Sequence, residues 1–206
     1  MESIRELMRM GYGPSSSHTM APRSAAERFS AQYPAARYCV YLYGSLAASG
    51  RGHRTDFALQ QAFAPAEVEI IWQPEVVLPV HPNAMRMQAL GEDGSATAER
   101  LIYSVGGGAV QEEGETLQPQ AVYPLSTMND ILAYCDKQGL TFWEYVEACE
   151  GDDIWAYLAE VWETMCAAIH RGIGAEGVLP GGLGLARKAS SFYRKVRMGG
   201  AHMQKG

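Results

Sequence analysis

The sequence predicts an α+β fold: a small α/β-like domain with a mixed sheet and helices, followed by an all-helical segment. Stretches rich in β-branched and aromatic residues alternate with helix-forming stretches through the first half of the chain. The second half instead carries apolar residues at helical spacing. The 206 residues, of which 47% are hydrophobic and 19% charged, are enough for one domain and a smaller second piece.

The first half contains two predicted helices and four predicted strands. The helices cover residues 21–33 and 54–64, where apolar residues recur three and four positions apart. The first strand is expected to run into a turn at Gly44. The strands cover residues 36–46, 67–72, 83–90 and 99–105. Because a helix, a strand, a helix and several strands follow one another, we expect the helices to cover one face of the sheet.

A change of character near residue 124 divides the chain. We expect a β domain over residues 1–124 and a linker with helices over residues 125–206. Acidic residues are concentrated between residues 111 and 163, whereas residues 183–206 carry only basic charges. Such a basic tail is suited to an acidic surface on a partner.

Helix signals are clear in the second half. Thr141 and Glu144 form a T-x-x-E capping box just after Gly139, which is typical of one helix ending and the next beginning. A long amphipathic helix is predicted from Asp152, and a basic helix over residues 186–197. The apolar stripe of the long helix consists of Ile154, Leu158, Val161, Trp162, Met165 and Ile169.

The bulk properties argue against several classes of protein. A net charge of −6 gives no general attraction for nucleic acid or anionic membranes. No apolar run approaches the roughly 18–20 residues of a membrane span, and the N-terminus lacks a signal-peptide core, so we expect a cytoplasmic protein. The cysteines form no CxxC pair, which favours reduced thiols over disulfides or a zinc site. They are Cys39, Cys135, Cys149 and Cys166.

Three histidines lie in loops rather than on apolar faces. They are His18 in "SSSHT", His53 in "GRGHRTD" and His81 in "PVHPNAM". Loops hold most catalytic groups because a rigid scaffold presents them to solvent, and imidazole titrates near neutral pH. These three side chains are therefore candidate proton carriers.

The stretch "GPSSSHT" has two possible functions. Thr19 or a nearby serine can cap the helix that begins near Met20. Ser15, Ser16 and Ser17 would then present N–H groups and hydroxyls at the positive helix end, where a carboxylate or phosphate binds readily. A plain capping turn and an anion-binding loop both remain open.

Other loops leave similar choices. Asp56 either orients His53 or starts a helix, and Asn83 either contacts a small polar substrate or closes a turn. The glycines of residues 105–110 lack the G-x-G-x-x-G spacing, so close approach to another backbone is favoured over a phosphate loop. The chain also lacks the G-x-S-x-G elbow of a serine hydrolase around His18.

Five motifs taken in order resemble the iron–sulfur-dependent L-serine dehydratase family. They are "GPSSSHT" at 13–19, "YGSLAASGRGHRTD" at 43–56, "LPVHPNAM" at 78–85, "YSVGGG" at 103–108 and "GVLPGGLGLARKA" at 177–189. The resemblance runs from near Ser3 to about Arg197. It implies a serine dehydratase β domain over residues 1–124 and the first helices of a truncated α domain over residues 125–206.

The resemblance implies deamination of L-serine to pyruvate and ammonia, a step of amino-acid degradation that can feed gluconeogenesis. A [4Fe-4S] cluster would act as Lewis acid while a base removes the Cα proton. The family's cluster ligands lie in the later α domain, so we expect no metal ligands in this chain. The implied partners are a serine dehydratase α domain or subunit, without which the chain is inactive, and a second copy in a homodimer.

Carried over position by position, the resemblance makes His53 the general base and His18 a second catalytic residue. Residues of the serine loop and of the "HPN" loop would bind the substrate; they are Ser15, Ser16, Ser17, Thr19, His81 and Asn83.

Two departures from the family pattern affect these loops. Arg54 and Ala84 stand where the family has glycine, and the added side chains are expected to narrow the loops and alter substrate fit. Two other functions stay open: a non-catalytic amino-acid-binding or regulatory module, and an inactive fragment. The residues do not distinguish L-serine from L-threonine as substrate.

Overall fold

The computed structural model describes residues 1–115, 121–180 and 184–199, and its contacts divide the chain into two units. We call Gly11–Leu117 the sheet unit, and Met1–Met10 with Gln118–Pro180 and Gly184–Gly206 the helical unit. Residues 181–183 of the motif at 177–189, and residues 200–206 of the predicted α segment, lie outside the described residues.

A five-stranded mixed sheet forms the centre of the sheet unit, which confirms the predicted fold class. The strand order is β2-β1-β3-β4-β5, with β1 and β2 parallel and the other neighbours antiparallel. The strands are β1 (Arg37–Tyr43), β2 (Glu67–Gln73), β3 (Ala84–Leu90), β4 (Ala96–Gly106) and β5 (Ala109–Glu112). The first four match the predicted strands, and β5 was not predicted.

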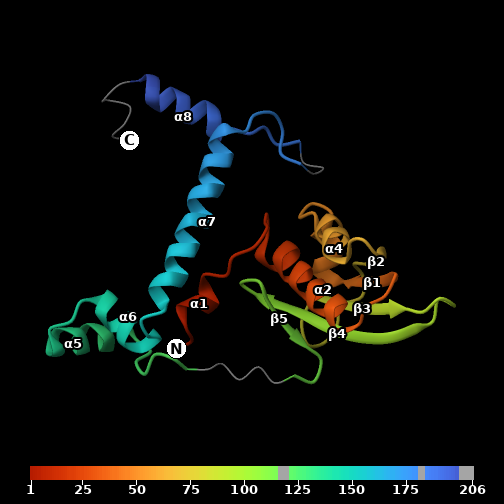
Figure 1. Cartoon of the computed structure of the whole chain (residues 1–206), viewed down its shortest axis with the longest axis horizontal. Coiled ribbons are helices and arrows are strands. Elements are labelled where there is room, and N and C mark those ends of the chain that lie inside the picture. The colour runs from red at the N-terminus through yellow and green to blue at the C-terminus, as the bar shows by residue number, and fades with distance from the viewer. Residues whose placement is uncertain (116–120, 181–183, 200–206) are drawn as a thin grey trace. The chain divides into compact units, whose positions relative to one another are not determined.

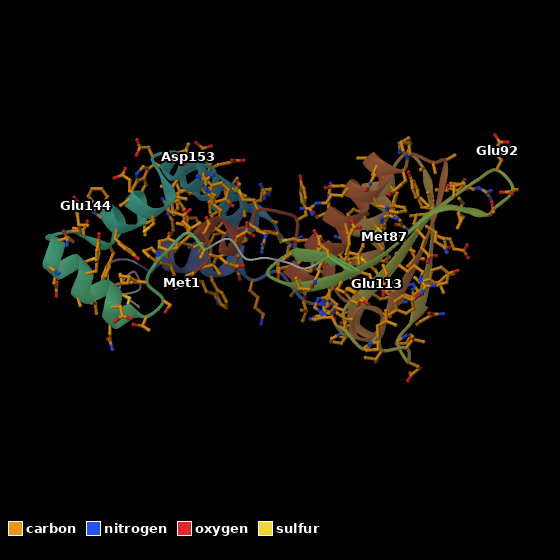
Figure 2. The ribbon with its side chains drawn as sticks, turned by 90° about the horizontal axis from the view of Figure 1, so that it is seen from below. Met1, Met87, Glu92, Glu113, Glu144 and Asp153 are labelled. Atoms are coloured by element: carbon orange, nitrogen blue, oxygen red, sulfur yellow. The ribbon has the colours of Figure 1, made fainter. Side chains whose placement is uncertain are left out.

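Two helices cover one face of this sheet, α2 (Ala21–Gln32) and α4 (Thr55–Phe63) (Figure 1). Alternate side chains of the strands point toward them. In the register of β1 and β3, Val40 lies opposite Met87 and Leu42 opposite Met85, and all four side chains are buried. Burial of each such side chain contributes roughly 1.5–3 kcal/mol to folding. Figure 2 shows Met87 in this interior, whereas Glu92 points away at the tip of the β3–β4 connection.

A short helix replaces the turn that was predicted at Gly44. Helix α3 (Gly44–Gly50) begins directly after β1, and Gly44 has a φ of +48°. A Cβ atom at this position would lie 2.6 Å from the carbonyl oxygen of Pro82. Glycine is required there because the chain turns in the left-handed region while another backbone passes close by.

The glycines at 106–108 make a hairpin turn between β4 and β5. All three have positive φ angles, from +56° to +108°. A Cβ atom at Gly106 would have no neighbour within 4 Å. The expected close approach of another backbone is therefore wrong at this position, and the glycine is needed for backbone conformation.

The two departures from the family glycines have different surroundings. Ala84 is fully buried as the first residue of β3 and packs with Tyr43 and Tyr103. Arg54 adopts φ +58° and ψ +36°, in the left-handed region, and its guanidinium lies 4.1 Å from the centre of the Phe57 ring. The backbone at residue 54 thus keeps a conformation that favours glycine although the side chain is long.

The helical unit has its own small core of Tyr123, Ile131, Cys135 and Tyr145. Its helices are α1 (Ile4–Leu7), α5 (Met128–Gln138), α6 (Phe142–Glu150), α7 (Ile154–Gly174) and α8 (Ala189–Met198). The predicted capping box is confirmed, since the Glu144 carboxylate accepts the N–H of Thr141 at 2.7 Å.

The first ten residues pack with this helical core, although the sequence grouped them with the β domain. The carboxylate of Glu150 accepts the hydroxyls of Ser3 and Tyr123, each at 2.7 Å, and the N–H of Ile4 at 2.8 Å. These hydrogen bonds lower the pKa of Glu150 against the opposing effect of burial, which is the largest single influence on it. The ionised carboxylate therefore ties α1 to the end of α6.

Helix α7 forms as predicted, but its apolar stripe is covered only at the start. Ile154 is fully buried, whereas Trp162, Met165 and Ile169 are each at least half exposed. Within the described part of the chain, no helix combines the length and apolar character needed to cross a membrane.

The backbone at residue 54 yields a stability prediction. We expect Arg54→Gly to be more stable than Arg54→Ala by about 1 kcal/mol, because a Cβ atom in the left-handed region costs roughly that amount and the ring contact is lost in both variants. Urea unfolding of the two proteins measures the difference.

Arg51 supplies the matched control. It also stacks on an aromatic ring, that of Trp72, but its φ is −61°. Arg51→Gly should therefore be less stable than Arg51→Ala by about 0.5–1 kcal/mol. If the glycine variant were the more stable of the two at both positions, or the less stable at both, our account of residue 54 would be contradicted.

Candidate active site

A single π-helical turn over Ser16–Met20 carries the serine loop and leads into α2. Ser15 is its cap, because the Ser15 hydroxyl accepts the N–H of His18 at 3.1 Å. This confirms the predicted capping by a serine near the helix start. The N–H groups of Ser16 and Ser17, in the first turn, have no intrahelical acceptor and are available to an anion.

Pro22 leaves a carbonyl of this turn without its regular donor. The N–H of Ala21 donates to the carbonyl of Ser16, five residues earlier. In the same pattern the partner of the Ser17 carbonyl would be Pro22, which has no N–H group. The hydroxyl of Ser104 on β4 donates to the Ser17 carbonyl instead, at 2.9 Å.

A second buried hydroxyl holds the next carbonyl. Thr55, at the start of α4, donates to the carbonyl of His18 at 2.5 Å. Thr55 and Ser104 are both fully buried. Sequence reasoning did not assign either residue to the site, although both lie inside quoted motifs, "HRTD" and "YSVGGG". The signal that the sequence offered for these two residues was a small hydroxyl side chain next to apolar residues of the kind that are usually buried.

The imidazole of His18 is buried, with 9% of its surface exposed, and both ring nitrogens have partners. Nε2 lies 3.2 Å from the carbonyl oxygen of Ser45, and Nδ1 lies 2.9 Å from the hydroxyl of Ser17. Burial lowers the pKa of His18, the hydrogen bond to Ser45 opposes this shift, and the nearby His53 adds to it. The ring is therefore held neutral.

His53 lies against His18, with the two ring centres 4.9 Å apart. Its backbone is fixed from both sides: its N–H donates to Ser49 and Gly50, and its carbonyl accepts the hydroxyl of Thr19 at 2.7 Å. The half-buried ring of His53 is the more accessible of the pair. Two side chains predicted to be catalytic, 35 positions apart in the sequence, thus form one cluster.

Asp56 does not orient His53 among the described hydrogen bonds. Its carboxylate accepts the N–H of Phe57 at 2.9 Å, in the first turn of α4. This contact fits the interpretation that Asp56 starts a helix and not the interpretation that it orients His53.

The "HPN" loop adjoins the serine loop through backbone contacts. The N–H of Ser45 donates to the Pro82 carbonyl at 3.1 Å, and the N–H of Ser104 donates to the Asn83 carbonyl at 2.8 Å. Ser45 and Ser104 thus each contact both loops. The Nδ1 atom of His81 accepts the N–H of Asn83 at 3.1 Å. The described contacts do not include one between the ring of His81 and the rings of His18 and His53.

Asn83 keeps an unused acceptor. Its Oδ1 atom is buried and has no hydrogen-bond partner among the described residues. Buried polar atoms in native proteins are nearly always paired, so this atom is suited to a donor on a bound molecule.

The described residues do not form a site for a metal ion or cluster. No three histidine, cysteine, aspartate or glutamate side chains in residues 1–115, 121–180 and 184–199 gather closely enough to hold one. The four cysteines are free thiols on four different elements, β1, α5, α6 and α7. A [4Fe-4S] cluster does not fit these residues.

Comparison with known proteins places the site in a known context. A family model described as "Serine dehydratase beta chain" matches residues 3–69 and 58–115, which include every candidate residue from Ser15 to Ser104. L-serine dehydratase 1 of Escherichia coli is 31% identical over 95% of this chain and 54% of its own length. The L-serine dehydratases of Haemophilus influenzae and Streptomyces coelicolor are 31% and 29% identical over 96% of this chain and 55% of their own lengths. The chain spans about half the length of these relatives.

The contact of Ser104 with the serine loop predicts a loss of stability on its removal. We expect Ser104→Ala to lower the free energy of unfolding by about 1–3 kcal/mol, because the Ser17 carbonyl would keep no donor. Ser30→Ala is the control, since the Ser30 hydroxyl donates to Glu27 within the exposed part of α2. Equal urea midpoints for the two variants would contradict this account.

The neutral His18 predicts a loss of stability in acid. Because its folded pKa lies below the usual value near 6.5, the unfolded chain binds a proton first as the pH falls. Stability is therefore full above about pH 6.5 and declines as the pH falls toward the folded pKa. His18→Gln should reduce this decline in urea midpoint between pH 7.5 and 5.5. His170→Gln, on the exposed face of α7, should not. An unchanged decline in His18→Gln would refute the assignment.

Proposed function

The chain belongs to the serine dehydratase beta chain family, and on this basis we propose that it supplies the substrate-binding part of an L-serine dehydratase. The proposed reaction converts L-serine to pyruvate and ammonia. The chain spans about half the length of its relatives, which supports the proposal that the complete enzyme includes a further region or subunit.

The observation that carries this proposal is the pair of histidine rings beside a helix start. His18 and His53 lie 4.9 Å apart at their centres, and His18 belongs to the same helical turn as Ser16 and Ser17. A proton carrier beside an anion site is what removal of the Cα proton from an amino acid requires. An amino-acid sensor would need the anion site but no proton carrier.

Substrate binding is assigned to main-chain and side-chain groups of two loops. The N–H groups of Ser16 and Ser17 bind the carboxylate of L-serine at the positive end of the helix. The unpaired Oδ1 atom of Asn83 accepts a hydrogen bond from the substrate ammonium group. Ser15, Thr19 and His81 hold these loops through the hydrogen bonds described above.

His53 is assigned as the base. It accepts the Cα proton of L-serine, and the C–O bond at Cβ breaks to give aminoacrylate. The proton taken from Cα and the hydroxide released from Cβ together make the one water molecule that is lost. Addition of water to the imine form of aminoacrylate and loss of ammonia give pyruvate. The Cα proton is weakly acidic, so the base must be close to it and accessible, which the half-buried ring of His53 satisfies better than the buried ring of His18.

The [4Fe-4S] cluster that the resemblance implies does not fit the described residues. We therefore propose that it belongs to the remaining half of the enzyme, an α region or α subunit, and that this chain is active only together with it. We expect the complete enzyme to be a cytoplasmic homodimer.

Reconstitution tests the proposal. The chain is mixed under anaerobic conditions with the part of Escherichia coli L-serine dehydratase 1 that it does not match, the iron–sulfur cluster is rebuilt, and pyruvate is assayed with L-serine. Pyruvate from the mixture and not from either component alone is expected. A bound cluster without pyruvate formation would contradict the proposed activity and favour a non-catalytic module.

The assignment of the base makes a kinetic prediction. In the active mixture, His53→Ala should lower kcat by about 10²–10⁴-fold with little change in KM, because a general base contributes about that factor to the chemical step. His170→Ala on α7 is the control and should keep the wild-type kcat. A kcat near wild type in His53→Ala would remove His53 from this role.

A further inference from the structure

The hydrogen bonds around His18 have only one consistent direction. A main-chain carbonyl can only accept, so the contact of 3.2 Å between Nε2 of His18 and the Ser45 oxygen requires the proton on Nε2. A neutral imidazole carries one N–H, and its other nitrogen is then an acceptor. The hydroxyl of Ser17, 2.9 Å from Nδ1, must therefore be the donor in that pair.

The same reasoning extends to Ser15. The hydroxyl oxygens of Ser15 and Ser17 are 3.5 Å apart. Since the proton of Ser17 points to His18, only Ser15 can donate in this contact. The donors thus run from Ser15 to Ser17, from Ser17 to His18, and from His18 to the Ser45 carbonyl.

Burial supports the neutral form that this direction requires. A charged ring would lose solvation at a site with 9% exposure, and the pKa of His18 is lowered for that reason. His53 is the titratable side chain that the described contacts place against the ring, and a positive charge on it would act in the same direction.

From this geometry we infer that His18 is locked as the neutral Nε2–H tautomer and is a positioning residue for Ser17, not a proton carrier. Its Nε2 proton is bound by a carbonyl, and its Nδ1 lone pair is occupied by Ser17. Neither nitrogen is free to accept the Cα proton, so that role is left to His53.

The inference also limits what Ser17 can bind. Its only hydroxyl proton is committed to His18, so Ser17 can accept a hydrogen bond from a ligand but cannot donate one to a carboxylate. Binding of a carboxylate at this loop then depends on main-chain N–H groups. The role of the loop in substrate binding rests on the proposed function, whereas the tautomer does not.

Nuclear magnetic resonance of the whole 206-residue chain tests the tautomer without any need for turnover. Long-range ¹⁵N–¹H correlations at neutral pH distinguish the two neutral tautomers and the charged ring of each of the five histidines. The His18 signals are identified by their loss in His18→Gln. We expect a protonated Nε2 and an unprotonated Nδ1. An Nδ1–H tautomer, averaged tautomers or a charged ring would overturn the inference.

Variants of the serine loop test the direction of the chain. Ser17→Ala should shift the Nδ1 resonance of His18, because its donor is lost, while the tautomer stays the same. Ser16→Ala is the control, since that side chain is exposed, and should leave the His18 resonances in place. Equal shifts in both variants would overturn the direction. If Ser17→Ala does not fold, the tautomer of His18 in the spectra of the wild-type chain tests the inference by itself.

Kinetics of the active mixture separate positioning from proton transfer. His18→Gln retains an N–H for the Ser45 carbonyl and should keep kcat within about tenfold of wild type, and above that of His18→Ala. His53→Gln should lose as much as His53→Ala, about 10²–10⁴-fold. Equal losses in His18→Gln, His18→Ala and His53→Gln would overturn the positioning role. An inactive wild-type mixture would contradict the proposed function, and the tautomer would still be decided by the spectra.

Discussion

Pro22 has no N–H group, and the candidate site depends on how the missing hydrogen bond is replaced. In the turn before α2, the regular donor to the carbonyl of Ser17 would be the backbone N–H of residue 22, and that residue is Pro22. Ser104, a buried residue of β4, donates in its place, and Thr55 of α4 holds the neighbouring carbonyl of His18. A strand and a helix are thereby joined to one turn. Ser17 and His18 take their positions from these contacts, as does the ring of His53 through its contact with His18.

The predictable parts of the fold are those with a long periodic pattern. The strands β1–β4, the helices α2 and α4 and the amphipathic α7 were expected from apolar spacing, and α6 from its capping box. The segments that were not predicted are short or lack such a pattern. Helix α3 has glycine at both ends and, apart from Leu46, only alanine and serine between them, which resembles a turn. Its helical form depends on tertiary contacts, such as the close passage of Pro82 at Gly44.

In the site as well, the residues that lie in local sequence motifs could be predicted, and the residues that act through long-range contacts could not. His18 and His53 could be proposed because their loops are rich in glycine and serine, and because five motifs resemble one family. The residues that position them could not be found in this way. Thr55 and Ser104 contact the turn across 37 and 87 positions of the sequence. In the sequence, a hydroxyl among apolar neighbours is compatible with packing alone, and only the fold reveals the carbonyl that it serves.

Arg54, next to His53, has a consequence for the number of conformations open to this loop. Glycine at that position could exchange between left-handed and right-handed backbone conformations at little energy, whereas arginine has fewer accessible backbone conformations and lies here in the left-handed region with its guanidinium over the ring of Phe57. The native state therefore contains fewer arrangements of the loop than a glycine would allow. In the proposed reaction, less conformational entropy is then lost when the substrate fixes His53 than with glycine at residue 54.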